Sequence, residues 1–154
     1  MYFWLLDTSY LLPIIGVSIK DLPRDTMIKL IKRGYQISIS DITIFELSAI
    51  GAKHAVLGRL DAERVCRGIR AILHDERITR IPIHDSSILL TALELRRMLS
   101  EFIDCLILSS AMARSEILIT EDKDIQDLSR EEEFQEFLKK KKSEFKIQPL
   151  HAIS

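Results

Sequence analysis

The feature that most constrains the fold of this sequence is an alternation of short β-prone runs with longer stretches of helical periodicity. The runs typical of strands are Tyr2–Leu6, Gln36–Ser40, Ile78–Ile83, Glu116–Thr120 and Phe145–Gln148. Apolar residues recur at helical spacing in Arg24–Arg33, Asp41–Leu57, Asp61–His74, Asp85–Leu99, Phe102–Arg114 and Glu131–Lys142. Strands that alternate with helices are joined by right-handed crossovers. We therefore predict an α/β fold, a three-layer α/β/α sandwich with a central, mainly parallel sheet.

Residues at the ends of several segments support these helices. Gly34 is placed to end the first helix, and Asp41 and Asp85 are candidate N-caps of two others. The segment Phe102–Arg114 is apolar on nearly every side, which predicts a helix buried at the centre of the fold.

Composition and length limit the class of protein. The 154 residues predict one domain over residues 1–154, and 47% apolar with 29% charged residues is typical of a globular chain. Lys plus Arg (22) nearly balance Asp plus Glu (23), so no overall basic field indicates nucleic-acid binding, although a local basic patch remains compatible with this balance.

Asp7 and Pro13 interrupt the apolar N-terminal stretch, so we predict no membrane segment and a cytoplasmic location. Cys66 and Cys105 are predicted to be reduced packing residues.

Four acidic residues occupy positions where carboxylates are chemically notable. Asp7 directly follows the apolar run that ends at Leu6, and Asp122 follows Ile117–Thr120. Ligands of parallel α/β sheets bind beyond the carboxyl ends of the strands, so both acids are expected at one edge of the sheet. Glu46 and Asp104 lie among large apolar neighbours in helical segments, where a charge is costly to bury without a neutralising partner.

Each of these acids also has a structural interpretation. Asp7 and Asp122 could form turns, Glu46 could be exposed, and Asp104 could cap a helix. These interpretations do not explain why the four acids are placed together at strand ends and on the apolar faces of helices. Four carboxylates aimed at one spot repel one another unless a cation lies between them, and oxygen-only ligands suit Mg²⁺ or Mn²⁺ rather than zinc.

Four motifs in this order resemble those of the PIN-domain ribonuclease family, particularly VapC-like toxins and stand-alone archaeal PIN proteins. They are Leu5–Leu11, with the pattern hydrophobic-Asp-Thr/Ser, Ile42–Leu47 around Glu46, Asp104–Ala111, and Ile117–Asp124. The resemblance covers almost the whole chain. Ser9 stands where many members carry Asn, and Ile125 where many carry Phe.

The resemblance implies an acidic pocket that binds Mg²⁺ or Mn²⁺ and endonucleolytic cleavage of RNA, along with frequent homodimers and, for toxins, an antitoxin partner. Asp7 and Asp104 are then the first choice for direct metal ligands, and Asp122 and Glu46 bind the metal directly or through water. Ser9 and Thr120 are then candidate supporting donors, with a plain structural use as the alternative for each. Asp124 is either a fifth acid at the rim of the site or a turn residue.

Some features leave alternatives open. Arg64, Arg67 and Arg70 form a basic stripe on one helix, which is either a substrate contact or a solvated face. A catalytically inactive PIN-fold RNA-binding or assembly module is the alternative function. A haloacid-dehalogenase-type phosphatase is disfavoured, because Ser9 stands where its second acid belongs. The sequence leaves open the RNA target, the number of metals, the oligomeric state, and the choice between toxin and processing nuclease.

Overall fold

A computed structural model describes residues 3–142 and 144–152 of the chain. Within these residues one five-stranded parallel sheet has the order β3-β2-β1-β4-β5. Its strands are β1 (Phe3–Leu6), β2 (Gln36–Ser40), β3 (Ile78–Ile81), β4 (Ile117–Ile119) and β5 (Lys146–Gln148). All five predicted strands are confirmed, three of them shorter than expected. The predicted first strand began at Tyr2, which lies outside the described residues.

All six predicted helices are confirmed, with shifted ends in most cases. They are α1 (Thr26–Lys32), α2 (Asp41–Val56), α3 (Ala62–His74), α4 (Ser86–Leu95), α5 (Phe102–Arg114) and α7 (Glu132–Lys141). Three elements were not predicted: the 3₁₀ helices η1 (Thr8–Ile15) and η2 (Leu150–Ala152), and the α-helix α6 (Lys123–Leu128). These segments contain proline or are too short to show a helical period.

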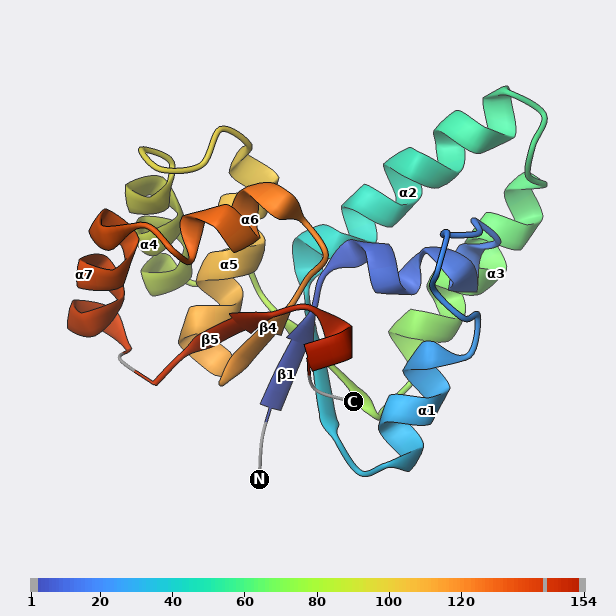
Figure 1. The fold of residues 1–154 in the computed structure, drawn as a ribbon. Coiled ribbons are helices and arrows are strands. Elements are labelled where there is room, and N and C mark those ends of the chain that lie inside the picture. Colours follow the sequence, from blue (N-terminus) through green and yellow to red (C-terminus); the bar gives the residue numbers. More distant parts are fainter. Residues whose placement is uncertain (1–2, 143, 153–154) are drawn as a thin grey trace.

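The helices cover the two faces of the sheet in two groups (Figure 1). Leu5 of β1 points into a core formed with α4, α5, α6 and α7. Its neighbours Trp4 and Leu6 point into a second core formed with η1, α1, α2 and α3. This alternation follows from the two-residue period of a strand, and it confirms the three-layer α/β/α fold. As predicted, α5 is central, because its residues Cys105–Met112 are all buried.

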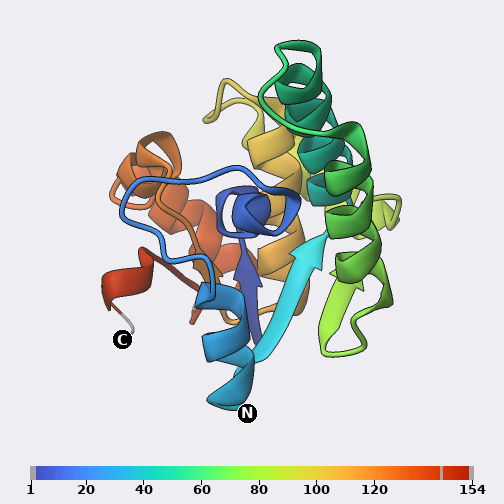
Figure 2. The same ribbon diagram turned by 90° about the vertical axis from the view of Figure 1, so that its right-hand side faces the viewer.

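Helices α2 and α3 form a close pair that also packs against η1 (Figure 2). Two glycines permit this packing. A Cβ atom on Gly51 would lie 2.4 Å from Val65 Cγ1, and one on Gly68 would lie 2.4 Å from the Ile14 carbonyl oxygen. The pair extends beyond the end of the sheet toward which β1 points (Figure 1), so it flanks the edge where Asp7 emerges.

The helix ends confirm two predicted signals and correct one. Gly34, at φ +89°, follows the last turn of α1, and Asp85 caps α4 by accepting from Ser87 N at 2.9 Å. The prediction that Asp41 caps α2 is wrong. Ser40 is the cap and accepts from Ile42 N at 3.3 Å, while Asp41 lies in the first turn.

Two further expectations concern cysteines and membranes. Cys105 is buried as predicted, but Cys66 is exposed, so its assignment as a packing residue is wrong; its neighbour Val65 packs into the core instead.

Among the helices of residues 3–142 and 144–152, none has the combination of length and hydropathy needed to cross a membrane.

Candidate active site

The acidic residues gather where the order of the strands reverses direction. From β1 the chain fills the sheet first on one side, through β2 and β3, and later on the other side, through β4 and β5. Open parallel sheets bind ligands at such a switch point, outside the carboxyl ends of the strands. Leu6 pairs with Ile119, and the Asp7 amide donates to the Ile119 carbonyl at 3.0 Å. Asp7 and the segment after β4 therefore emerge side by side.

Asp7 is held by two short hydrogen bonds. The Thr8 amide donates to Oδ1 at 2.7 Å, and the Thr120 hydroxyl donates to Oδ2 at 2.7 Å. The pKa of Asp7 is nevertheless raised to about 6, mainly by burial and to a smaller extent by the charges of Glu46 and Asp122, while the two hydrogen bonds oppose the shift. Since the net shift is upward, the surroundings of Asp7 disfavour its negative charge.

Glu46 reaches the same place from α2, which begins directly at the end of β2. The Thr8 hydroxyl donates a short hydrogen bond to Glu46 Oε1 and lies 3.0 Å from the Thr43 hydroxyl. Thr8 therefore connects Asp7 to Glu46. We predicted Ser9 as the supporting residue and missed Thr8, because the direction of each side chain depends on the 3₁₀ turn that starts after Asp7. Ser9 instead lines a neighbouring pocket.

Asp104 lies in the first turn of α5, and it is not the N-cap, which is Glu101. Burial raises the pKa of Asp104 to about 7, and the charges of Asp122, Asp7, Glu46 and Glu101 add to the shift. Among residues 3–142 and 144–152, no Lys or Arg is among the main causes of the pKa shift of Asp7 or Asp104. The four predicted acids are thus electrostatic neighbours.

Asp122 completes the group and has a structural role as well. Its carboxylate caps α6 by accepting from Ile125 N at 3.1 Å, and its amide donates to the Thr120 hydroxyl at 3.0 Å. Thr120 therefore links Asp7 to Asp122 through these two hydrogen bonds. Asp124 is exposed and lies in the first turn of α6.

The donor set fits a hard divalent cation in its chemistry. Its groups are carboxylate and hydroxyl oxygens, which Mg²⁺ and Mn²⁺ prefer. In the part of the chain that the structure describes, no three Asp, Glu, His or Cys side chains are arranged to hold one ion. The carboxylates share one edge but do not form a closed set of ligands. Mutual repulsion keeps such groups apart, and an ion would draw them together.

The predicted basic stripe on α3 divides into two kinds of residue. Arg64 is half-buried and donates to the Ile14 carbonyl at 2.5 Å, so it joins α3 to η1. Arg67 is exposed, with Glu63 at 3.9 Å, and Arg70 is also exposed. Arg67 and Arg70 are therefore the fully exposed members of the stripe, while Arg64 already serves a contact within the fold.

Comparison with known sequences defines the class. A profile of the PIN domain family matches residues 4–131. The chain therefore belongs to the PIN domain family, a family of nucleases, and the resemblance seen in its motifs is confirmed. No curated protein sequence matches the chain.

Solved structures with the same fold come from toxin–antitoxin systems. VapBC2 from Rickettsia felis, bound to a promoter DNA fragment, aligns with a TM-score of 0.59 and 19% identity over 95% of this chain and 98% of that one. A toxin–antitoxin complex from Klebsiella pneumoniae aligns with a TM-score of 0.51 and 23% identity, over 79% of this chain and 88% of that one. VapC20 from Mycobacterium tuberculosis, a toxin that cleaves the sarcin–ricin loop, aligns with a TM-score of 0.59 and 13% identity, over 80% of this chain and 93% of that one. At these identities the likeness establishes the fold.

Proposed function

We propose that this protein is a Mg²⁺- or Mn²⁺-dependent endoribonuclease that hydrolyses phosphodiester bonds of RNA. Asp7, Glu46, Asp104 and Asp122 are its catalytic and metal-binding residues, with Thr8 and Thr120 as supporting donors. The observation that carries the proposal is the set of acids joined at the switch point of the sheet, where Thr8 contacts Asp7 and Glu46, and Thr120 contacts Asp7 and the Asp122 amide. Burial also raises the pKa values of Asp7 and Asp104. Acids that serve only the fold are normally neutralised by basic groups or hydrogen bonds, whereas sites that await a cation leave such charge uncompensated.

The residues of the chain have distinct tasks in this proposal. Asp7 and Asp104 bind the cation directly, and Glu46 and Asp122 bind it directly or hold its water. The hydroxyls of Thr8 and Thr120 fix the orientation of Glu46 and Asp7. A bound divalent cation would neutralise phosphate charge and lower the pKa of an attacking water.

A direct test uses the purified chain and a mixed RNA pool, with Mn²⁺, with Mg²⁺, and with EDTA. We expect new RNA ends only in the metal-containing reactions, and sequencing of the ends locates the cuts. Asp104→Asn should abolish cleavage. The matched control is Asp127→Asn, which changes an exposed aspartate on α6 that pairs with Arg130. Full cleavage by Asp104→Asn, or cleavage in EDTA, would contradict the site assignment.

An inactive RNA-binding or assembly module is the alternative function. The two differ in what metal does to the folded protein. A functional site should raise the melting temperature at millimolar Mg²⁺ or Mn²⁺, because ligands stabilise the state that binds them. No shift, together with RNA binding that leaves the RNA intact, would favour the inactive module.

A role as the toxin of a toxin–antitoxin pair is a further proposal, favoured by one observation beside the structural neighbours. Phe45 is 63% exposed on α2, the helix that also carries Glu46, so it offers an apolar contact to a partner on this helix. A partner segment that continued along α2 from Phe45 to Glu46 would obstruct the acids. Co-expression with the neighbouring reading frame tests this idea: a true antitoxin should co-purify and inhibit cleavage, and Phe45→Ser should weaken both effects.

The homodimer, the cytoplasmic location and the single domain over residues 1–154 stay predictions. Light scattering of the purified protein tests the first. An exposed apolar face on α4, made of Leu89, Leu90 and Leu93, is the surface to change if a dimer is found.

A further inference from the structure

Basic residues gather on one side of the molecule, which the net charge of −1 conceals. Residues 16–34 and 49–74 hold ten of the 22 Lys and Arg but only four of the 23 Asp and Glu. These two segments include α1 and α3, which both pack against η1 (Figure 2). A local basic surface of this kind attracts anionic ligands even where the whole chain is nearly neutral.

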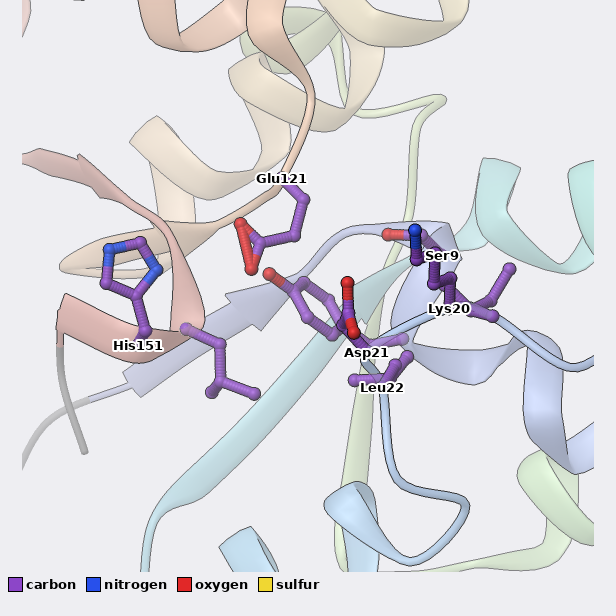
Figure 3. Close-up of a pocket in the computed structure, with 9 residues that line it drawn as sticks. Ser9, Lys20, Asp21, Leu22, Glu121 and His151 are labelled. Atoms are coloured by element: carbon purple, nitrogen blue, oxygen red, sulfur yellow. The ribbon is translucent and has the colours of Figure 1, made fainter.

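Two pockets near this basic side differ in the charge of their walls. The larger, of about 520 Å³, is lined by Lys20 and His151 but also by Asp21 and Glu121 (Figure 3), so it favours neither sign of ligand. The smaller, of about 240 Å³, lies between the two basic segments, and all charged residues among its described lining are arginines. The smaller pocket is therefore the one suited to an anion.

Arg64 is already fixed in the smaller pocket by the fold. Its Nη1 donates to the Ile14 carbonyl at 2.5 Å, which uses one of the five N–H groups of the guanidinium. Gly16 forms the adjacent wall at φ +99°, and a Cβ atom on it would lie 3.1 Å from Leu60 Cδ2 and 3.4 Å from Arg64 Cγ. The glycine therefore keeps this wall free of a side chain, and Arg64 retains N–H groups that can donate into the pocket.

Arg24 is the second cation of the pocket, and no carboxylate in the described part of the chain pairs with it. Two nearby acids are engaged elsewhere, since Asp25 pairs with Lys29 at 3.3 Å and Asp61 caps α3 by accepting from Glu63 N at 3.1 Å. Two guanidinium groups on one pocket repel each other, and an anion between them removes this repulsion.

We propose that this pocket binds one phosphate of the RNA backbone, several nucleotides away from the cleaved bond. Guanidinium groups match the oxygens of a phosphate in geometry, and the exposed Ser18 hydroxyl adds a donor. η1 begins beside Asp7 and ends at Gly16, roughly 18 Å away at the rise of a 3₁₀ helix. The acids at the near end of η1 repel RNA until a cation is bound, so a distant cationic contact supplies affinity that the acidic site lacks.

The assignment rests on the proposed nuclease function, so its first test measures binding without cleavage. Fluorescence anisotropy follows labelled oligouridylate in EDTA at several salt concentrations. Arg24→Ala should weaken binding about tenfold and lower the slope of log K against log salt by about 0.7. The matched control is Arg33→Ala, an exposed arginine at the other end of α1 and outside the pocket, which should stay within about twofold of wild type.

A conservative variant separates charge from geometry. Arg24→Lys should restore the salt slope but only part of the affinity, because lysine keeps the charge and loses the planar fork. Arg64 is left intact in these experiments, since its replacement would also remove the contact with Ile14.

In the second arm, cleavage with Mn²⁺ is measured on RNAs of increasing length. In wild type the KM should fall once the RNA is long enough to reach from the acids to the pocket. This fall should be lost in Arg24→Ala and kept in Arg33→Ala.

Equal oligouridylate binding by wild type and Arg24→Ala, or equal losses in Arg24→Ala and Arg33→Ala, would overturn the proposal. Tighter binding of an oligoglutamate peptide than of oligouridylate would also overturn it and assign the pocket to an acidic protein segment. A loss specific to Arg24→Ala in a protein that cleaves no RNA would support the phosphate site and overturn only the nuclease function.

Discussion

Carboxylates occur in two different settings in this molecule, one beside β3 at the edge of the sheet and one at the switch point. Beside β3, Asp75 pairs with Arg77 through two bonds of 2.9 Å, and Asp85 accepts from Ser87 and from Arg114 at 3.1 Å. Hydrogen bonds from Arg77 and from Ser87, respectively, lower the pKa values of these two acids. At the switch point, burial and neighbouring acids raise the pKa values of Asp7 and Asp104.

The opposite pKa shifts distinguish acids whose charge stabilises the fold from acids whose charge destabilises it. The acids beside β3 are already satisfied by donors from the same chain, so an added cation has little to offer them. The acids at the switch point keep charge that the protein itself does not neutralise, and this arrangement lowers the stability of the metal-free protein. Proteins retain such unfavourable charge mainly where an external ligand uses it.

The largest effect is expected from exchanging one acid in each setting for asparagine. Asp7→Asn should lower metal-dependent RNA cleavage at least about 100-fold, because it removes a negative metal ligand. Asp85→Asn should leave the rate within about twofold, since Asn can still cap a helix. Initial rates on one RNA, with circular dichroism to check folding, measure both. Equal losses in the two variants would remove the functional distinction between the settings.

The second effect concerns stability and pH without metal. The pKa of Asp7 is about 6 in the folded protein against 3.8 for an ordinary aspartate, so the folded state binds the proton more tightly. Its contribution to stability is therefore full below pH 3.8 and is lost as the pH rises through about 6. The loss for Asp7 amounts to roughly 3 kcal/mol.

Chemical denaturation in EDTA, at several pH values between about 4 and 7.5, measures this dependence. The free-energy difference between wild type and Asp7→Asn isolates the aspartate from the other groups that titrate. Asp7→Asn should be the more stable protein at the upper end of this range, and Mg²⁺ should reverse the order. A difference that does not vary with pH would show that folding leaves the pKa of Asp7 unchanged, and a difference that shifts in favour of wild type as the pH rises would show that Asp7 is stabilised as Asp75 is.

A third and smaller effect is expected at Thr120, which donates to Asp7 and accepts from the Asp122 amide. Thr120→Val keeps the shape but removes the hydroxyl, and should lower metal affinity and cleavage about tenfold. Thr120→Ser should restore most of both. Metal titrations followed by the melting temperature give the affinity. A serine variant as impaired as the valine variant would indicate that packing, rather than the hydrogen bonds, explains the loss.

The smallest effect is expected on α3. Arg67→Ala and Arg70→Ala should each raise the KM for RNA a few-fold and reduce the salt dependence of binding by about one phosphate contact. Arg64→Ala should mainly lower stability, because Arg64 binds the Ile14 carbonyl. Binding curves at several salt concentrations separate the three variants. Unchanged KM and salt slope in both exposed variants would identify the stripe as a solvated face.

The sequence alone determined much of this architecture. The two-residue and 3.6-residue periods located every strand and six of the helices, because such patterns arise from local backbone geometry and the burial of one face. The same reasoning placed Asp7 and Asp122 after strands, and the charges of the other predicted acids do act on Asp7 and Asp104. The elements it missed, η1, α6 and η2, are short or contain proline, so their periodicity is too brief to detect.

Tertiary structure decided what no local pattern encodes. The position of β1 between β2 and β4 creates the switch point, and the bond from Thr120 to Asp7 joins residues 113 positions apart. Whether Thr8 or Ser9 faces the acids depends on the turn of η1, and whether an aspartate is compensated depends on which distant side chains reach it. These outcomes depend on contacts between segments far apart in the chain, and periodicity within a segment contains no information about them.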